Sequence, residues 1–348
     1  MEKIRFGVVG TNFITDWVIA GGREDERFEL SAVCSRSEQT AKAYAEKQHI
    51  PHHFTSLEAM AASQHIDAVY IASPNAFHAQ QSILCMQHGK HVLCEKSFAS
   101  NAREVRMMIE TAHQQGVVLM EAMKPTLTPS FDAVRNQLHQ LGVIRRYFSC
   151  YCQYSSRYDK LKEGIVLNAF LPEMSNCSTM DIGVYTIYPM VVLFGKPATI
   201  HAVGTNLSTG VDGQAAVNFT YSNGMVATAL YSKIADSALP TEIQGEAGTV
   251  RLDRINIISE VTFIDRKGGK ISNIRPETPH HEYYYEIAEF INIIQSGRKE
   301  SLVNSLANSL MTIEIMDEIR KQLGVHFPAD QVLPVRDNLR PISRQNQK

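Results

Sequence analysis

The sequence contains little cysteine and tryptophan, has no long apolar run, and carries charges that nearly cancel. Six cysteines and one tryptophan occur in 348 residues, and because no two cysteines form a C-x-x-C pair, a disulfide framework is not expected. Lys+Arg 34 against Asp+Glu 36 gives a formal net charge of -2, which argues against a general nucleic-acid or membrane-surface binder. No apolar run approaches the roughly 18 residues that span a bilayer, and the first residues enter a strand-like run without signal-peptide features. We therefore expect a cytoplasmic protein with no membrane or nucleic-acid partner.

The composition is that of an ordinary globular protein. Hydrophobic residues make up 44% and charged residues 20% of the chain, so disorder as the main state is not expected. At roughly 150 residues per domain, the length predicts two domains.

The first third alternates short apolar runs with amphipathic helical patterns. The apolar runs lie at 4–10, 30–34, 68–72, 91–94 and 117–121, and the helical patterns lie at 37–48, 76–88 and 101–115. This alternation predicts β-α-β crossovers and a doubly wound parallel sheet, with strands buried on both faces. We place this first domain at 1–123.

The rest of the chain has a different pattern. We expect helices at 129–141, 179–194, 283–295 and 302–323, a strand at 144–154, an irregular stretch up to 172, and antiparallel strands over 198–264. Pro189 lies inside one of these helices and predicts a kink. The pattern predicts an α+β domain with an open, mainly antiparallel sheet at 124–330, and a solvated tail at 331–348.

Two cysteines stand two positions apart in the strand predicted at 144–154. Cys150 and Cys152 are expected on one face of that strand, together with Phe148 and Tyr154. Core packing is favoured over redox or metal chemistry there, because matching ligands are absent from the neighbouring sequence.

The first strand-to-helix turn is a candidate phosphate site, because such a turn offers free amides and the positive end of a helix dipole. Of a G-x-G-x-x-G pattern only Gly10 is present; Asn12 and Thr15 take the other two glycine positions. Asparagine tolerates positive φ better than most residues. An ordinary α/β turn is the alternative. The cofactor-binding residues predicted here are Gly10, Thr11, Asn12, Phe13 and Ile14.

The end of the second predicted strand bears on which dinucleotide is bound. No acidic residue stands there to hold a ribose diol; the run contains Ser35 and Arg36 instead. Arg36 can pair with a 2'-phosphate, and Ser35 or Ser37 can donate to it. NADP is thus favoured, with NAD possible. The alternative is a surface arginine that opens the next helix.

Two further strand ends are expected to flank the nicotinamide half of the cofactor, because ligands lie outside the carboxyl ends of parallel strands. The residues concerned are Ser73, Pro74, Asn75, His78, Glu95 and Lys96. A lysine directly after a buried strand is hard to explain as a solvated side chain. His78 either lines the cofactor cleft or caps its helix.

In this order, five motifs resemble those of the glucose-fructose oxidoreductase / inositol dehydrogenase (Gfo/Idh/MocA) family. They are Gly10-Thr11, Ser73-Pro74-Asn75 with His78, Glu95-Lys96, Glu121-Ala122-Met123, and Asp181-Ile182-Gly183-Val184-Tyr185. The resemblance covers about residues 3 to 330 and implies a Rossmann domain followed by an α+β domain whose sheet often mediates oligomer contacts. It implies an NADP- or NAD-dependent oxidoreductase that acts on a small polyhydroxylated substrate, a sugar, polyol or diol, and that forms a homo-oligomer, a dimer or tetramer.

The resemblance also implies the roles of three residues. Lys96 matches a lysine that touches the nicotinamide ribose and the reacting oxygen, and Asp181 and Tyr185 match the catalytic site. Tyrosine at 185 is closer to the dihydrodiol dehydrogenase and sugar oxidoreductase branch than to the inositol dehydrogenases. Ser97, the stretch 175–178 and Lys124 depart from the family pattern, and the last two bear on the identity of the substrate.

The chemistry of these residues is consistent with that role. Hydride transfer at a carbinol carbon needs a group that exchanges the hydroxyl proton, and a tyrosine becomes a useful base where a cation stabilises its phenolate. Lys96 could supply that charge, while Asp181, four positions before Tyr185, could orient the substrate or the lysine. We predict Lys96, Asp181 and Tyr185 as catalytic residues and no metal site. The alternative is a regulatory protein that binds NADP without turnover.

Overall fold

The structure is a computed structural model that describes residues 2–331. Of the tail predicted at 331–348, all but the first residue lies outside the described residues.

The first part of the chain builds a six-stranded parallel sheet in the order β3-β2-β1-β4-β5-β6. The strands are β1 (Ile4–Val9), β2 (Phe28–Cys34), β3 (His52–Phe54), β4 (Ala68–Ile71), β5 (His91–Glu95) and β6 (Leu119–Ala122). The predicted doubly wound sheet is confirmed, and the strand order reverses between β1 and β4, where such sheets bind ligands. The sequence analysis missed the short strand β3.

Five helices connect these strands: α1 (Phe13–Gly22), α2 (Glu38–Gln48), α3 (Leu57–Ala62), α4 (Asn75–Gln87) and α5 (Ala102–Gln115). Side-chain caps start four of them, because Asn12, Ser37, Ser56 and Asn101 accept hydrogen bonds from the free amides of α1, α2, α3 and α5. The six-residue helix α3 was not predicted.

The second part of the chain builds an eight-stranded sheet in the order β14-β13-β12-β11-β7-β10-β9-β8. Its strands are β7 (Ile144–Cys152), β8 (Thr199–Asn206), β9 (Asp212–Thr220), β10 (Val226–Ser232), β11 (Thr241–Gly245), β12 (Gly248–Leu252), β13 (Val261–Asp265) and β14 (Ile271–Asn273). Only β7 and β10 pair in parallel, and the other neighbours pair antiparallel. The prediction of an open, mainly antiparallel sheet is confirmed.

The helices of this part are α6 (Pro129–Gln137), α7 (Ser156–Lys162), α8 (Val184–Phe194), α9 (Tyr284–Gln295) and α10 (Leu306–Leu323). Three expectations need correction. The stretch expected to be irregular contains α7, a π-helical turn at Thr179–Gly183 precedes α8, and α10 begins at Leu306. Short 3-10 turns lie at Lys124–Leu127, Leu138–Leu141, Asn168–Phe170, Pro172–Met174 and Pro328–Asp330.

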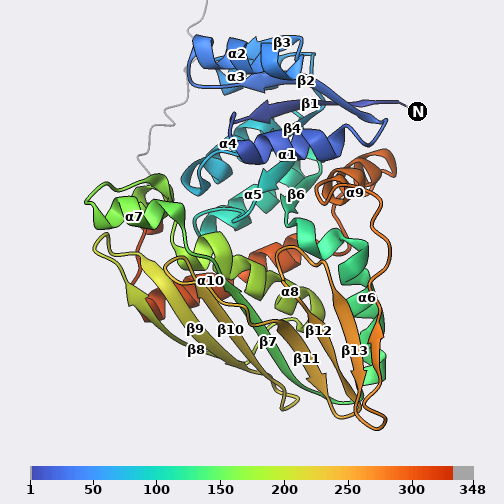
Figure 1. Ribbon diagram of the computed structural model, residues 1–348. Coiled ribbons are helices and arrows are strands. Elements are labelled where there is room, and N and C mark those ends of the chain that lie inside the picture. Colours follow the sequence, from blue (N-terminus) through green and yellow to red (C-terminus); the bar gives the residue numbers. More distant parts are fainter. Residues whose placement is uncertain (1, 332–348) are drawn as a thin grey trace, which may run out of the picture.

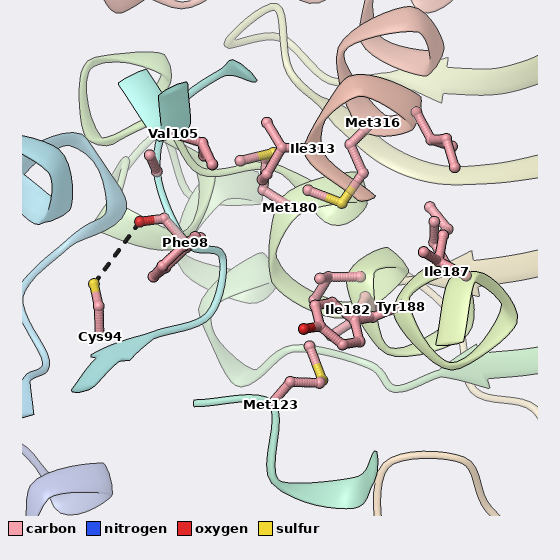
Figure 2. Packing of buried hydrophobic residues seen from close by; sticks show 14 of the residues in the cluster. Cys94, Phe98, Val105, Met123, Met180, Ile182, Ile187, Tyr188, Ile313 and Met316 are labelled. Atoms are coloured by element: carbon pink, nitrogen blue, oxygen red, sulfur yellow. Dashed lines mark hydrogen bonds between the residues drawn. The ribbon is translucent and has the colours of Figure 1, made fainter. Parts of the chain in front are cut away.

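The two sheets lie at opposite ends of the molecule, with α8 and α10 between them (Figure 1). One continuous core cluster joins residues of both parts. Figure 2 shows side chains from this cluster, among them Phe98 and Met123 from the first part of the chain and Met180, Ile182, Ile313 and Met316 from the second. Helix α9, although late in the chain, packs against α1 and contributes Ile287 and Phe290 to the core of the parallel sheet.

One stretch of the described residues, Pro172–Phe194, is long and apolar enough to cross a membrane, but 72% of its most apolar window is buried inside the protein. It contains α8, whose buried face packs under the second sheet. Its apolar character therefore has a sufficient explanation in core packing.

Candidate active site

A large cleft of about 1180 Å³ is lined by residues from both parts of the chain. Of the predicted site residues, Asn12, Phe13, Ile14, Ser73, Glu95, Lys96, Asp181 and Tyr185 line it. Gly10, Thr11, Ser35, Arg36, Pro74, Asn75 and His78 do not contribute to its lining. The cleft thus brings residues of the first turn together with the predicted catalytic residues.

The turn from β1 into α1 has the geometry of a pyrophosphate site. Gly10 has φ +102, and a Cβ at this position would lie 2.8 Å from the carbonyl oxygen of Ala72, so only glycine fits. Asn12 has φ -89 and therefore does not use the positive φ that asparagine tolerates. Its side chain instead caps α1, accepting from the amides of Ile14 and Thr15, and donates to the Ala72 carbonyl oxygen at 3.0 Å. Because Asn12 takes the amides of Ile14 and Thr15, the fit of this turn to a dinucleotide rests on the glycine at position 10 and on the start of α1.

The end of β2 fits the adenosine end of NADP. Arg36 is exposed just before α2, and the nearby Glu38 carboxylate pairs with His53 at 2.8 Å, which leaves the guanidinium available. Ser37 caps α2 by accepting from the Thr40 amide at 3.2 Å. The hydroxyl of Ser37 is therefore used to cap the helix. Ser35, on the other side of Arg36 in the chain, is half-buried.

The loops after β4 and β5 are joined by a buried histidine. The ring nitrogens of His78 lie 2.7 Å from the carbonyl oxygen of Ser73 and 2.8 Å from that of Ser97. Asn75 donates to the Ser175 carbonyl oxygen at 3.0 Å and so reaches the second domain. His78 was expected either to line the cleft or to cap its helix, and its contacts show neither role. They hold the two loops at a fixed spacing instead.

The predicted catalytic residues meet in a charged cluster. Lys96 Nζ lies 2.9 Å from Asp181 Oδ1 and 2.8 Å from the Asp181 carbonyl oxygen. Lys233 Nζ lies 2.7 Å from Asp181 Oδ2 and 2.9 Å from the Ala169 carbonyl oxygen. Burial alone would raise the pKa of the Asp181 carboxyl, but the ammonium groups of Lys233 and Lys96 hold that pKa well below its usual range. Asp181 is therefore a carboxylate that fixes two lysines.

Tyr185 lies beside this cluster. Lys96 Nζ lies 5.1 Å from the centroid of its ring, and the ring of Tyr151 packs edge-on against it at 5.5 Å. Burial raises the pKa of Tyr185, and the opposing effect of Lys96 is smaller. The cation expected from the sequence is present, but the phenol is protonated at neutral pH, which suits a proton donor.

Lys124, one of the departures from the family pattern, is buried in the same cleft. Its Nζ lies 2.6 Å from Glu282 Oε2 and 4.6 Å from the centroid of the Tyr283 ring. Nearby, the Tyr70 hydroxyl donates to Glu95, and burial raises the pKa of the Glu95 carboxyl. Lys124 thus ties the segment before α9 to the end of β6.

Two residues of this site, Lys233 and Glu282, were not predicted from the sequence. Lys233 directly follows the buried strand β10, and that is the signal that singled out Lys96 after β5. The pairing of Lys124 with Glu282 joins residues far apart in the chain, and no local sequence pattern predicts it. Among residues 2–331, no group of three or more His, Cys, Asp or Glu side chains could hold a metal ion.

Comparison with known proteins agrees with this geometry. Residues 4–123 match the model described as "Oxidoreductase family, NAD-binding Rossmann fold", and residues 139–251 match the GFO/IDH/MocA C-terminal domain. The chain is 50% identical to scyllo-inositol 2-dehydrogenase (NADP(+)) IolU of Bacillus subtilis (strain 168), over 94% of this chain and 99% of the relative. It is 28% identical to trans-1,2-dihydrobenzene-1,2-diol dehydrogenase of Mus musculus, again over 94% and 99%.

The solved structures show the same fold. Levoglucosan dehydrogenase in complex with NADH and levoglucosan matches with a TM-score of 0.83 at 17% identity, covering 93% of this chain and 98% of that one. Fold and site together define an NAD(P)-dependent oxidoreductase that acts on a CH-OH group. The chain belongs to the Gfo/Idh/MocA family. The relatives named above are dehydrogenases, which supports an enzyme over the regulatory alternative.

Proposed function

We propose that this protein is an NADP-preferring dehydrogenase of a small cyclic polyol, with Lys96, Asp181 and Tyr185 as its catalytic residues. The observation that carries the proposal is the cluster in which Asp181 holds Lys96 and Lys233 at 2.9 and 2.7 Å beside the phenol of Tyr185. Such a cluster, in a cleft that reaches the dinucleotide turn, supplies both positioning and proton transfer.

When bound, the nicotinamide ring accepts or gives the hydride at the carbinol carbon. Residues of this chain position the reacting oxygen and transfer its proton. Lys96, oriented by Asp181, donates a hydrogen bond to the reacting oxygen, and the protonated phenol of Tyr185 gives the proton when a ketone is reduced. In the direction of alcohol oxidation the same phenol must first lose its proton, so this direction is expected to speed up toward alkaline pH.

The cleft supports a polyhydroxylated substrate. Its lining includes amide and carboxylate side chains that can hold several hydroxyl groups, among them Asn168, Asn176, Asp253, Asn256 and Glu282. A relative 50% identical over nearly its full length is a scyllo-inositol dehydrogenase that uses NADP, whereas the dihydrodiol dehydrogenases are 28% to 29% identical. This difference favours a cyclic polyol over an aromatic diol.

Turnover against a substrate panel tests the proposal. Reduction of NADP and of NAD is followed with inositol isomers, aldoses, linear polyols and trans-diols, and the fastest turnover is expected with NADP and an inositol isomer. Lys96→Met is expected to lower kcat by roughly 10²–10⁴-fold while NADPH still binds, as followed by its fluorescence. Full turnover in a Lys96→Met protein that binds NADPH would refute the mechanism.

We also propose that the chain forms a homo-oligomer, a dimer or tetramer, through the open face of its second sheet. Apolar side chains on this sheet stay exposed, including Val203 at 70% and Val226 at 39%, and such surface is commonly covered by a partner. Sedimentation velocity measures the state, and Val203→Glu with Val226→Glu is expected to yield monomers.

A cytoplasmic location is proposed as well. All six cysteines are free thiols, which suits a reducing compartment. Fractionation of cells that express the tagged chain tests this location.

A further inference from the structure

The two cysteines at the end of β7 form a close pair of thiols. Cys150 Sγ and Cys152 Sγ lie 3.7 Å apart. Residues two apart on one strand have Cα atoms roughly 6.6 Å from each other. This is near the upper end of the span of about 4.4–6.8 Å that a disulfide bridges, so closing the bond draws the two residues together. Besides the packing role expected from the sequence, this pair can therefore react as two neighbouring thiols.

The two sulfur atoms differ in character. Either sulfur atom can donate in the hydrogen bond between them. Donation by the Cys152 thiol, helped by a hydrogen bond from Ser237, lowers the pKa of Cys150. The same hydrogen bond, together with burial and the neighbouring Asp236 carboxylate, raises the pKa of Cys152. Since the thiolate is the reactive form, we assign Cys150 as the attacking residue and Cys152, whose sulfur lies 3.7 Å away, as its partner.

The other four cysteines lack this character. Burial raises the pKa of Cys34 to about 11 and that of Cys85 to about 12, and it raises the pKa values of Cys94 and Cys177 well above the ordinary value. Small reagents also reach the pair, because Cys150 and Cys152 line the cleft together with Ser237. The lowered pKa of Cys150 and the position of the pair in the cleft therefore distinguish Cys150 and Cys152 from the other four cysteines.

We propose that Cys150 and Cys152 form an oxidation site for small hydroperoxides, with Cys150 as the attacking and Cys152 as the resolving residue. The Cys150 thiolate attacks one peroxide oxygen, the O–O bond breaks, and hydroxide leaves as Cys150 becomes a sulfenic acid. Cys152 then attacks the Cys150 sulfur, the S–O bond breaks, and the disulfide forms. The oxygen leaves as water with the Cys152 proton. Two electrons pass from the two sulfurs to the peroxide.

This oxidation is expected to affect the neighbouring site. Tyr151 lies between the two cysteines in the chain, and its ring packs against Tyr185 at 5.5 Å. A disulfide across Tyr151 draws its two neighbours together and moves this ring, so dehydrogenase turnover is expected to fall several-fold and to recover on reduction. This consequence rests on the proposed function, whereas the oxidation itself does not.

Mass spectrometry of one peptide tests the chemistry without any turnover. Trypsin releases residues 147–157, which contain Cys150, Cys152 and no other cysteine. The intact protein is treated with hydrogen peroxide, its free thiols are blocked with N-ethylmaleimide, and it is digested. The expected peptide lacks the label and has lost two hydrogen atoms, and dithiothreitol restores labelling. Peptides with the other four cysteines stay labelled.

Two variants assign the roles. With dimedone present, Cys152→Ser is expected to trap a sulfenic acid on Cys150, whereas Cys150→Ser is expected to give no adduct. Equal adducts in both variants, or label retained at 147–157 while other cysteines oxidise, would overturn the proposal. An oxidised peptide with unchanged turnover would overturn the link to the active site. Cys85→Ala is the control for the turnover measurement, because this variant keeps the cysteine pair and should lose turnover under peroxide as the original protein does.

Discussion

At the scale of single residues, Asp181 connects the two domains by charge. Its carboxylate has one oxygen on Lys96, from the end of β5, and the other on Lys233, from the end of β10. Lys233 is buried with 3% of its side chain exposed. Since a hydrogen bond between charged groups contributes roughly 1.5–3 kcal/mol, the two lysines hold the carboxylate in one orientation. The carboxylate in turn fixes the ammonium group of Lys96.

Replacing Lys233 tests this arrangement. Lys233→Met leaves Asp181 Oδ2 without its partner, so the carboxylate can rotate toward Lys96 and draw it from the reacting oxygen. We expect kcat to fall by about ten- to a hundredfold while the Kd for NADPH is unchanged, as measured by steady-state kinetics and fluorescence titration. Lys160→Met, a surface lysine of α7 paired with Glu163, is the control. Equal kcat in both variants would contradict the positioning role.

Arg36 is the residue on which we expect cofactor preference to depend. Its guanidinium is exposed at the end of β2, where the 2'-phosphate of NADP would lie. Arg36→Ala is expected to lower kcat/KM with NADPH by about ten- to a hundredfold, the value of one charge-assisted contact, and to change kcat/KM with NADH little. Arg135→Ala, on α6 and paired with Asp132, is the control. An unchanged ratio of the two kcat/KM values would show that Arg36 plays no part.

At the scale of elements, buried apolar strands and long helices were predictable, whereas one short polar strand and two short helices were not. The alternation that indicated β1, β2, β4, β5 and β6 comes from strands buried on both faces. By contrast, β3 spans His52–Phe54 and α3 spans Leu57–Ala62, too few residues for a period to show. Helix α7 was missed for the same reason, since only seven residues form it. The π-helical turn before α8 depends on tertiary contacts, because the Thr179 amide and hydroxyl donate to Asp212.

The turn between β1 and α1 gives the element-scale prediction. In Gly10→Ala the new methyl group would lie 2.8 Å from the Ala72 carbonyl oxygen at φ +102, so the turn must shift, at a cost of roughly 1–3 kcal/mol. We expect weaker NADPH binding and a lower Tm, measured by titration and thermal unfolding. Gly89→Ala is the matched control, because it also has positive φ, +73, with no atom within 4 Å. It should lower Tm slightly and leave the Kd for NADPH unchanged.

At the scale of the whole molecule, the site exists only where two independently patterned halves meet. Lys96, Asp181 and Tyr185 were found from the order of motifs, and the cleft does bring them together. Lys233 and the Lys124–Glu282 pair could not be found in that way, since their partners lie 52 residues or more away. Ion pairs across a domain junction depend on how the halves dock, and docking depends on shared core packing, which has no local period.

Glu121 carries the final prediction, because it lies at this junction with no exposed surface. Its Oε1 accepts from the Phe98 amide at 3.1 Å, and Glu95 and Lys96 are the charged groups that act on it. Burial raises the pKa of Glu121 to about 8. Between its unfolded pKa of about 4.3 and that value, only the unfolded chain is ionised. The native state is therefore expected to lose stability as the pH rises through this window.

Glu121→Gln isolates the effect, because glutamine keeps the acceptor for Phe98 and does not titrate. Urea unfolding of both proteins at intervals from pH 5 to pH 8.5 gives the difference in free energy of unfolding. We expect this difference to shift in favour of the variant by about 1.4 kcal/mol per pH unit, and to level off above the folded pKa. All other titrating groups are common to both proteins, so parallel pH profiles would mean that Glu121 ionises at its ordinary pKa and that the junction tolerates a buried carboxylate.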